Sequence, residues 1–140
     1  MATVLSAIDV GRVPTGIDDR KLVLGILTYL VPSAIFTEVS LLKVLGEAAG
    51  KYSGSMFIPF RIGPEQTSSR RMTEIVNGLT GQGYLQRWGK PTQLMCKSKV
   101  AQETHVLRAP FNPTQQRAFG EIAARIVELA ENKKPAKQGG

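Results

Sequence analysis

The side chains best suited to chemistry in this sequence are an arginine and several amide and hydroxyl groups between positions 64 and 80. Arginine can grip guanine through two hydrogen bonds, and asparagine or glutamine can pair with adenine in the same way. Arg70 is therefore the best candidate reader of a base edge, and Asn77 and Gln66 are candidate partners for adenine. On a helix, Thr73 and Glu74 would share their outward face, where Glu74 could accept from cytosine.

Hydroxyl groups near the start of the same stretch suit phosphate oxygens. The free amide hydrogens at a helix N-terminus attract anions, and serine or threonine side chains there add further donors. Arg71 lies at the flank and suits the nucleic-acid backbone rather than a base. The candidate phosphate contacts of this stretch are Thr67, Ser68, Ser69 and Arg71.

A second group of cations follows in residues 87–99. Lys90 occupies a turn where it could meet a phosphate, with Arg87, Lys97 and Lys99 behind it. Residues 61–99 hold seven positive and two negative side chains, in a chain whose net charge is +7. One short stretch therefore carries most of a field that attracts polyanions. Because a charge run alone usually marks a solvated face, its interpretation as a DNA contact depends on the fold.

The remaining reactive side chains form no catalytic or metal-binding pattern. Cys96 and His105 are the only soft metal ligands, and two ligands cannot complete a tetrahedral zinc site. No third group is evident that would orient them as nucleophile and base. Cys96 alternates with Leu94, as a buried residue would, and the sequence has neither a P-loop nor a GxGxxG motif. We therefore expect neither an enzyme nor a cofactor or metal.

Hydrophobic spacing predicts two helices in the first half of the chain. Asp18 is a candidate N-cap for a helix over 19–31, which Pro32 would end. A second helix should begin at Thr37 or Glu38 and stop at Gly50, after a short apolar connector at 34–36.

Two further helices are expected in the second half. One, over 64–80, would stop at Gly81 and Gly83, and the other, over 113–132, has Asn112 as a cap and Gln115 completing an approximate capping box. The apolar residues at i, i+3, i+4 and i+7 of the first are Met72, Ile75, Val76 and Leu79.

Two strands, Tyr84–Trp88 and Thr92–Lys97, should form a hairpin with a basic tip. Tyr84 and Trp88 could stack on bases as single-strand binders do, but we expect both to pack against the core. Ser98–Phe111 is expected to be a loop. The predicted organisation is an irregular segment at 1–17, one domain at 18–132 that ends in helix 113–132, and a disordered basic tail at 133–140.

The sequence predicts a protein of the cytoplasm, where it would associate with the nucleoid, or of the nucleus. A lone cysteine fits a reducing compartment, and no secretory signal opens the chain. The most apolar stretch, Leu22–Phe36, is shorter than the roughly 20 residues of a membrane span. We therefore expect a protein that is neither secreted nor inserted in a membrane.

The order helix, strand, helix, helix, strand, basic turn, strand, helix resembles the winged helix-turn-helix superfamily, in the general style of MarR-like and ArsR-like regulators. Leu24–Gly46 resembles the first helix, first strand and positioning helix of such domains. Ser68–Trp88 resembles a recognition helix that runs into the first wing strand, with Leu79, Gly83, Tyr84-Leu85 and Arg87 at the matching places. The fold class this implies is α+β, mainly α: a winged helix-turn-helix with an inserted arm and a C-terminal helix.

The arm, Lys51–Gly63, departs from that pattern, because the family joins its two central helices by a short turn. Either the turn has been expanded, which we favour, or Met56–Ile62 is a true strand and the positioning helix is missing. Its apolar residues should not sit free in water. We expect the arm to pack partly on its own core and partly on a second subunit, with Lys51 and Arg61 near the DNA backbone; the alternative is a self-contained cover for the sheet edge.

The function implied is sequence-selective binding of double-stranded DNA, by a transcriptional or plasmid- or phage-type regulator that acts as a homodimer. One alternative is a winged-helix interaction subunit that holds a further protein partner, and another is an RNA or single-strand binder. The last helix could pack on its own domain or pair with its twin, and we favour the twin. The candidate dimer contacts are Phe119, Ile122, Ile126 and Val127.

Overall fold

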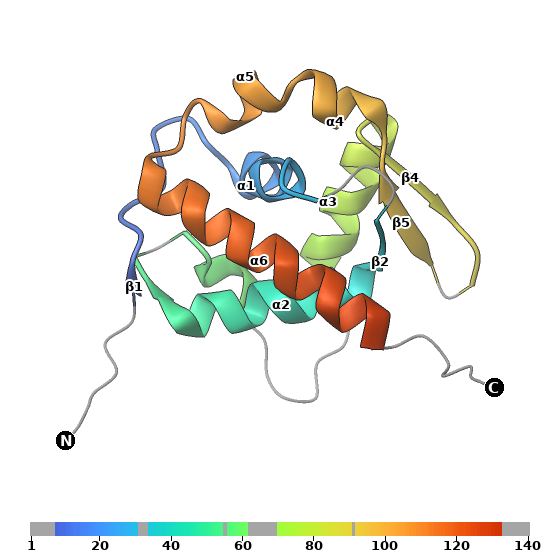
Figure 1. Cartoon of the computed structure of the whole chain (residues 1–140), viewed down its shortest axis with the longest axis horizontal. Coiled ribbons are helices and arrows are strands. Elements are labelled where there is room, and N and C mark those ends of the chain that lie inside the picture. The colour runs from blue at the N-terminus through green and yellow to red at the C-terminus, as the bar shows by residue number, and fades with distance from the viewer. Residues whose placement is uncertain (1–7, 31–33, 55, 62–69, 91, 133–140) are drawn as a thin grey trace.

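Helices form most of this α+β chain, and a small antiparallel sheet lies at one end of them, as a computed structural model shows (Figure 1). The structure describes residues 8–30, 34–54, 56–61, 70–90 and 92–132. The helices are α1 (Asp19–Leu27), α2 (Glu38–Lys51), the 3-10 turn η1 (Ile58–Phe60), α3 (Arg70–Gly81), α4 (Ser98–Gln102), α5 (Thr104–Arg108) and α6 (Pro113–Asn132). The strands are β1 (Ile8–Asp9), β2 (Ile35–Thr37), β3 (Tyr52–Ser53), β4 (Leu85–Trp88) and β5 (Gln93–Cys96).

Three helices begin at side-chain caps, of which the sequence predicts two, Asp18 and the Asn112 and Gln115 box. The Asp18 carboxylate accepts a hydrogen bond of 3.0 Å from a first-turn amide of α1. Thr37 and Ser40 form a reciprocal box at the start of α2, with bonds of 2.9 and 3.0 Å. Asn112 and Gln115 form another at α6, at 2.8 and 2.9 Å. Each cap satisfies amide hydrogens that a helix start leaves without partners, which fixes where these helices begin.

Two predicted helix ends are wrong. The first helix ends at Leu27 rather than at position 31, with Thr28 as its C-cap. Gly50 does not stop the second helix, which continues to Lys51 and passes directly into β3. A C-terminal glycine stop needs a left-handed backbone, and Gly50 is not among the glycines with positive φ, whereas Gly83 beyond α3 is, at +87°.

The sheet has the order β2-β5-β4, with antiparallel neighbours throughout. The predicted hairpin is confirmed as β4 and β5, each shorter than expected, and it projects beyond the helices (Figure 1). One face of the sheet is buried through Phe36, Leu85, Leu94 and Cys96. The opposite face leaves Ile35 and Trp88 exposed, because side chains alternate across a strand.

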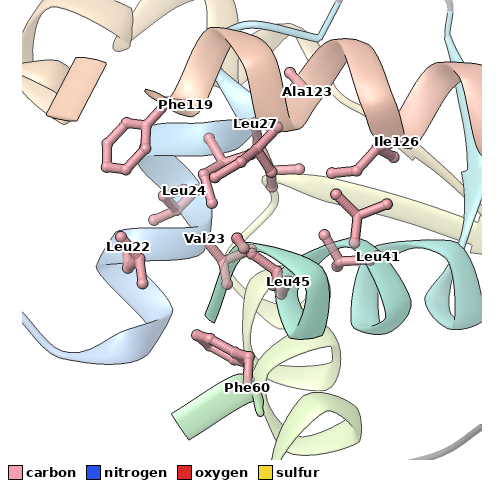
Figure 2. Packing of buried hydrophobic residues seen from close by; sticks show 14 of the residues in the cluster. Leu22, Val23, Leu24, Leu27, Leu41, Leu45, Phe60, Phe119, Ala123 and Ile126 are labelled. Carbon is pink, nitrogen blue, oxygen red and sulfur yellow. The ribbon is translucent and has the colours of Figure 1, made fainter. Parts of the chain in front are cut away.

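The core lies where α6 crosses α1 and α2 (Figures 1 and 2). Phe119, Ala123 and Ile126 of α6 face the α1 side chains Leu24 and Leu27 (Figure 2). Leu41 and Leu45 of α2 complete this layer, and Phe60 closes it from below (Figure 2). The predicted stripe of α3 is confirmed, since all four of its apolar side chains, Met72, Ile75, Val76 and Leu79, are fully buried.

The proposed dimer contacts of the last helix are therefore part of the chain's own core. Phe119 and Ile126 have no exposed surface, Ile122 has 3%, and Val127 packs half-buried against the same cluster. The expectation that this stripe faces a twin is wrong, because α1, α2 and β2 already cover it. The other possibility held open by the sequence, packing on the same domain, is what the structure shows.

The arm also packs on its own core. Met56, Phe57 and Phe60 are each 2% exposed, while Ile58 between them is 50% exposed. Residues 58–60 form a 3-10 turn, so the alternative of a strand over 56–62 is wrong for the part of it that the structure describes. The sequence predicts Lys51 near a DNA backbone, but the residue lies at the end of α2 that is away from the hairpin (Figure 1). Its Nζ is 3.6 Å from Oε1 of Glu121 on α6.

Two segments expected to be irregular have structure. Ile8 and Asp9 pair in parallel with Tyr52 and Ser53, and the Gln115 side chain donates to the carbonyl of Val10 at 2.8 Å. Residues 98–108, expected in a loop, form the short helices α4 and α5. Five-residue helices are too short to show a full amphipathic period, and only Val100 of these two helices is buried.

Candidate nucleic-acid interface

Arg70 is the most accessible cation of α3. Its side chain is 95% exposed, and its Nε lies 3.7 Å from Oε2 of Glu74, one helical turn further on. Exposed ion pairs at this spacing contribute only about 0.3–0.5 kcal/mol. Arg70 can therefore leave Glu74 for a guanine edge or a phosphate at little cost.

Arg71 holds α3 against α1. Its Nε donates to Oδ2 of Asp19 at 2.6 Å, its Nη2 pairs with the other oxygen of that carboxylate, and its Nη1 lies 3.2 Å from Glu74. The hydrogen bond from Arg71 lowers the pKa of Asp19, which keeps the carboxylate charged. A two-bond grip of this kind is among the stronger ion pairs. Arg71 therefore has a structural partner in place of the phosphate expected from the sequence.

Two more outward side chains of α3 also hold neighbouring elements. The Thr73 hydroxyl donates to Oε2 of Glu38, at the start of α2, at 2.8 Å. Asn77 accepts through its Oδ1 from Nη1 of Arg87 on β4. Polar ties thus fix α3 to α1, α2 and β4. Asn77 and Arg87, predicted as separate DNA contacts, are brought together here and can meet DNA only as a pair or after separating.

The charge around the described part of α3 does not favour a polyanion by itself. Arg70 and Arg71 are the cations of its outer face, and the carboxylates of Asp19, Glu38 and Glu74 lie against them or against Thr73. Arg87 bonds to Asn77 and the Arg20 guanidinium lies against Gly78, so four cations and three carboxylates surround the described part of α3 and nearly cancel. The positive field predicted for residues 61–99 must therefore come mainly from beyond this face.

The hairpin supplies that field. Lys90 in its turn and Lys97 at its base are exposed, and neither side chain has an ion pair or hydrogen bond among the residues that the structure describes. Lys99 donates to the carbonyl of Gln82 at 2.8 Å, and its ammonium lies 4.4 Å from the centre of the Tyr84 ring. Lys90 and Lys97 are the cations most ready to meet phosphate.

The two aromatic residues of the hairpin differ. The Tyr84 hydroxyl donates to Glu103 at 2.6 Å, a bond that raises the pKa of Tyr84 because the neutral phenol is the donor. Trp88 is 39% exposed on the outer face of β4. The expectation that both aromatics pack against the core is correct for the partly buried Tyr84 and wrong for Trp88, which the sequence could not distinguish because it does not tell which face of β4 is covered.

The remaining candidate residues lie before α3 and in β5. Gln66, Thr67, Ser68 and Ser69 lie outside the described residues. Cys96 is buried and its thiol points to the carbonyl of Leu27 at 3.9 Å; burial raises its pKa to about 12, so it is not a nucleophile at neutral pH. In the described ranges no three histidine, cysteine or acidic side chains gather as metal ligands.

Comparison with known proteins gives no match: no family model, no curated protein and no solved structure is similar to this chain. Within the part of the chain that the structure describes, no helix combines the length and the apolar character needed to cross a bilayer.

Proposed function

We propose that this chain is a winged helix-turn-helix protein that binds double-stranded DNA. The observation that carries the proposal is the sheet order β2-β5-β4, in which the strand between the first two helices pairs with β5, the second strand of a basic hairpin that directly follows α3. In this proposal α2 is the positioning helix, α3 the recognition helix and the hairpin the wing. The arm is the expanded turn between the two helices.

The two surfaces have different roles in this proposal. Lys90 and Lys97 supply phosphate contacts, which determine affinity but carry no sequence information. Arg70 is the base reader of the described part of α3, since its neighbours Arg71, Thr73 and Asn77 already hold α1, α2 and β4. These ties stabilise α3 in one orientation before DNA arrives, which lowers the entropy lost on binding.

The biological role we infer is that of a transcriptional or plasmid- or phage-type regulator. A homodimer remains part of this proposal, since paired recognition helices read two half-sites. It would need a surface other than the α6 stripe. The outer face of the sheet, with Ile35 and Trp88, is exposed and available to it.

The salt dependence of duplex binding tests the proposal. For a random duplex, each neutralised phosphate contributes about 0.9 to the slope of log affinity against log salt. Lys90→Ala and Lys97→Ala should each reduce that slope by about one unit. The matched control is Lys43→Ala, an exposed lysine of α2 one turn before Glu47, which pairs with Arg125 of α6; it should leave the slope unchanged.

Absence of duplex binding at about 50 mM salt, or equal slopes for all three variants, would contradict the proposal. The first result would favour the interaction-module alternative, for which the supporting observation is that carboxylates already hold Arg71 and Thr73 on the outer face of α3.

A second candidate function, single-strand binding, is supported by the exposed Trp88. Base stacking on an aromatic ring contributes about 1–3 kcal/mol per base. Because Trp88 is the only tryptophan of the chain, its fluorescence reports contact directly. Strong quenching by an oligothymidine strand, with tighter binding than to duplex, would favour this candidate, and stronger binding to duplex would exclude it.

A further inference from the structure

A pocket of about 310 Å³ opens between α1 on one side and α5 with the segment that follows it on the other. It lies apart from the exposed cations of the hairpin, although Gln82 and Tyr84 form one of its sides. The lining combines apolar and cationic side chains. Those that matter for its chemistry are Arg20, Lys21, Leu24, Tyr84, Leu107 and Phe111.

Arg20 is the unusual member of this lining. Its Nε is buried without a hydrogen-bond partner, the only such side-chain nitrogen or oxygen among the described residues. Its guanidinium lies against Gly78 of α3, where a Cβ would come within 3.2 Å of Cζ, so a larger residue at 78 would displace it. Buried polar groups are nearly always satisfied by protein or ordered water, so this guanidinium is the one described side chain with unused buried hydrogen-bonding capacity.

The carboxylates adjacent to Arg20 in sequence are committed elsewhere. Asp18 accepts the amide hydrogen of Lys21 at 3.0 Å as the N-cap of α1, and Asp19 is gripped by Arg71. Lys21 is exposed and has no ion pair among the residues that the structure describes. Asp18 also lines the pocket, but the structure gives it no ion pair with Arg20 or Lys21 among the described residues, so two cations and one carboxylate face the same space.

The rest of the pocket is apolar. Among its lining residues Leu24 and Phe111 are buried, Leu107 is half-buried, and Val106 is 68% exposed. Guanidinium groups favour carboxylates because their planar donors match both oxygens. We propose that this pocket binds a small organic anion, with its carboxylate at Arg20 and Lys21 and an apolar body against Leu24, Leu107 and Phe111.

The volume limits the size of that ligand. Small-molecule pockets commonly measure about 300–1,000 Å³, so this one suits a one- or two-ring acid. A second, smaller pocket of about 180 Å³ between α2 and α6 does not share this chemistry. Its cations are already paired, Lys51 with Glu121 at 3.6 Å and Arg125 with Glu47 at 3.1 Å.

The test is titration of the full chain with naphthoate, followed by amide chemical shifts in NMR, with no DNA present. Saturable shifts should centre on residues 17–24, 82–84 and 106–111. Naphthalenemethanol, the neutral alcohol of the same ring system, should bind at least about tenfold more weakly, since a charge-assisted bond contributes at least that factor. Arg20→Gln and Lys21→Gln should each weaken naphthoate, and Arg117→Gln, an exposed arginine of α6 outside the pocket, should not.

Absence of saturable shifts at millimolar naphthoate, equal binding of the neutral alcohol, or shifts centred elsewhere would overturn the assignment. Lys21→Gln keeps the test valid if Arg20→Gln loosens the contact with Gly78, because Lys21 is exposed. Since DNA is not part of the experiment, its failure leaves the DNA-binding proposal untouched.

Discussion

Arg70 and Asn77 both face outward on α3, but their existing contacts within the protein differ. Arg70 has one exposed partner at 3.7 Å, whereas Asn77 accepts from Arg87 and so joins α3 to β4. Arg70→Ala should therefore weaken binding to a selected duplex by about 1–3 kcal/mol and affect random duplex less. Asn77→Ala should mainly lower the free energy of unfolding, by about 0.5–1.5 kcal/mol.

Duplexes selected from a random pool, compared with the unselected pool, measure the first effect, and urea denaturation measures the second. If Arg70→Ala weakened binding to selected and random duplex equally, Arg70 would not be a base reader. A selective loss for Asn77→Ala without a change in stability would show that its bond to Arg87 opens on DNA.

Cys96 gives a prediction for alkaline pH. Burial raises the pKa of its thiol from 9.0 to about 12, so the folded chain keeps the proton that the unfolded chain loses. This contribution to stability is complete below pH 9 and is lost as the pH rises toward 12, by up to about 1.4 kcal/mol per pH unit. Tyrosines and lysines titrate in the same range, so the informative quantity is the difference between wild type and Cys96→Ala. Parallel stability curves for the two chains between pH 8 and 11 would contradict the buried assignment.

At the scale of elements, Gly25 shows how α1 meets α6. A Cβ at this position would come within 2.9 Å of the Phe119 ring and 3.1 Å of the Phe111 ring, which themselves pack edge to face at 4.7 Å between centroids. Helix propensity alone predicts that Gly25→Ala stabilises the chain by about 1 kcal/mol. We expect destabilisation instead, since two rings in a close-packed core cannot both move.

Gly50→Ala is the matched control for that change. Gly50 lies in α2, and a Cβ there meets nothing within 4 Å, so the propensity gain should appear unopposed. Thermal melts of the two variants should shift in opposite directions. A rise in Tm for both would show that the contact of Gly25 with the phenylalanine rings is looser than the structure indicates.

The arm, Lys51–Gly63, also contributes to the stability of the core. Phe60 is 2% exposed and faces the α2 layer of the core, while its neighbour Ile58 is 50% exposed. Phe60→Ala should cost about 3–5 kcal/mol of unfolding free energy, and Ile58→Ala should stay within about 0.5 kcal/mol. Chemical denaturation compares them. If both variants lost similarly little unfolding free energy, the arm would be only a cover on the surface.

The predictions that succeed rest on information local in sequence. Asp18 and Asn112 cap helices because their partners lie within three residues, and the α3 stripe follows from a period of 3.6. The failures involve distant partners. The pairing of Ile8 with Tyr52 and the grip of Arg71 on Asp19 join residues more than forty positions apart, and neither leaves a local pattern. For the same reason the sequence identifies Arg71 as a cation but not as a tie between helices.

At the scale of the whole molecule, packing and charge are separated. The apolar layer runs through α1, α2 and α6, and two unpaired cations, Lys90 and Lys97, lie on the hairpin that projects from it (Figure 1). This arrangement lets phosphate binding depend on side chains that contribute little to the core. Substitutions at Lys90 or Lys97 should therefore change affinity without changing stability, and substitutions in α6 should do the reverse.

The last helix provides the corresponding test of assembly. Ile126 of α6 is fully buried against other elements of the same chain. Ile126→Val should therefore lower the free energy of unfolding by about 0.5–1.5 kcal/mol. The loss should be the same at low and high protein concentration, because an intrachain contact does not depend on mass action.

Sedimentation equilibrium supplies the second readout, with Arg117→Ala on the exposed side of α6 as the control. Whatever mass the wild type shows, Ile126→Val should preserve it, because the folded chain keeps the surface that a partner would meet. A shift toward smaller mass, together with a stability loss that shrinks at high concentration, would mean that α6 exchanges its partner between chains. The packing of Phe119 against Gly25 opposes such an exchange, since α1 could release α6 only by exposing both rings of the Phe111 and Phe119 pair to water.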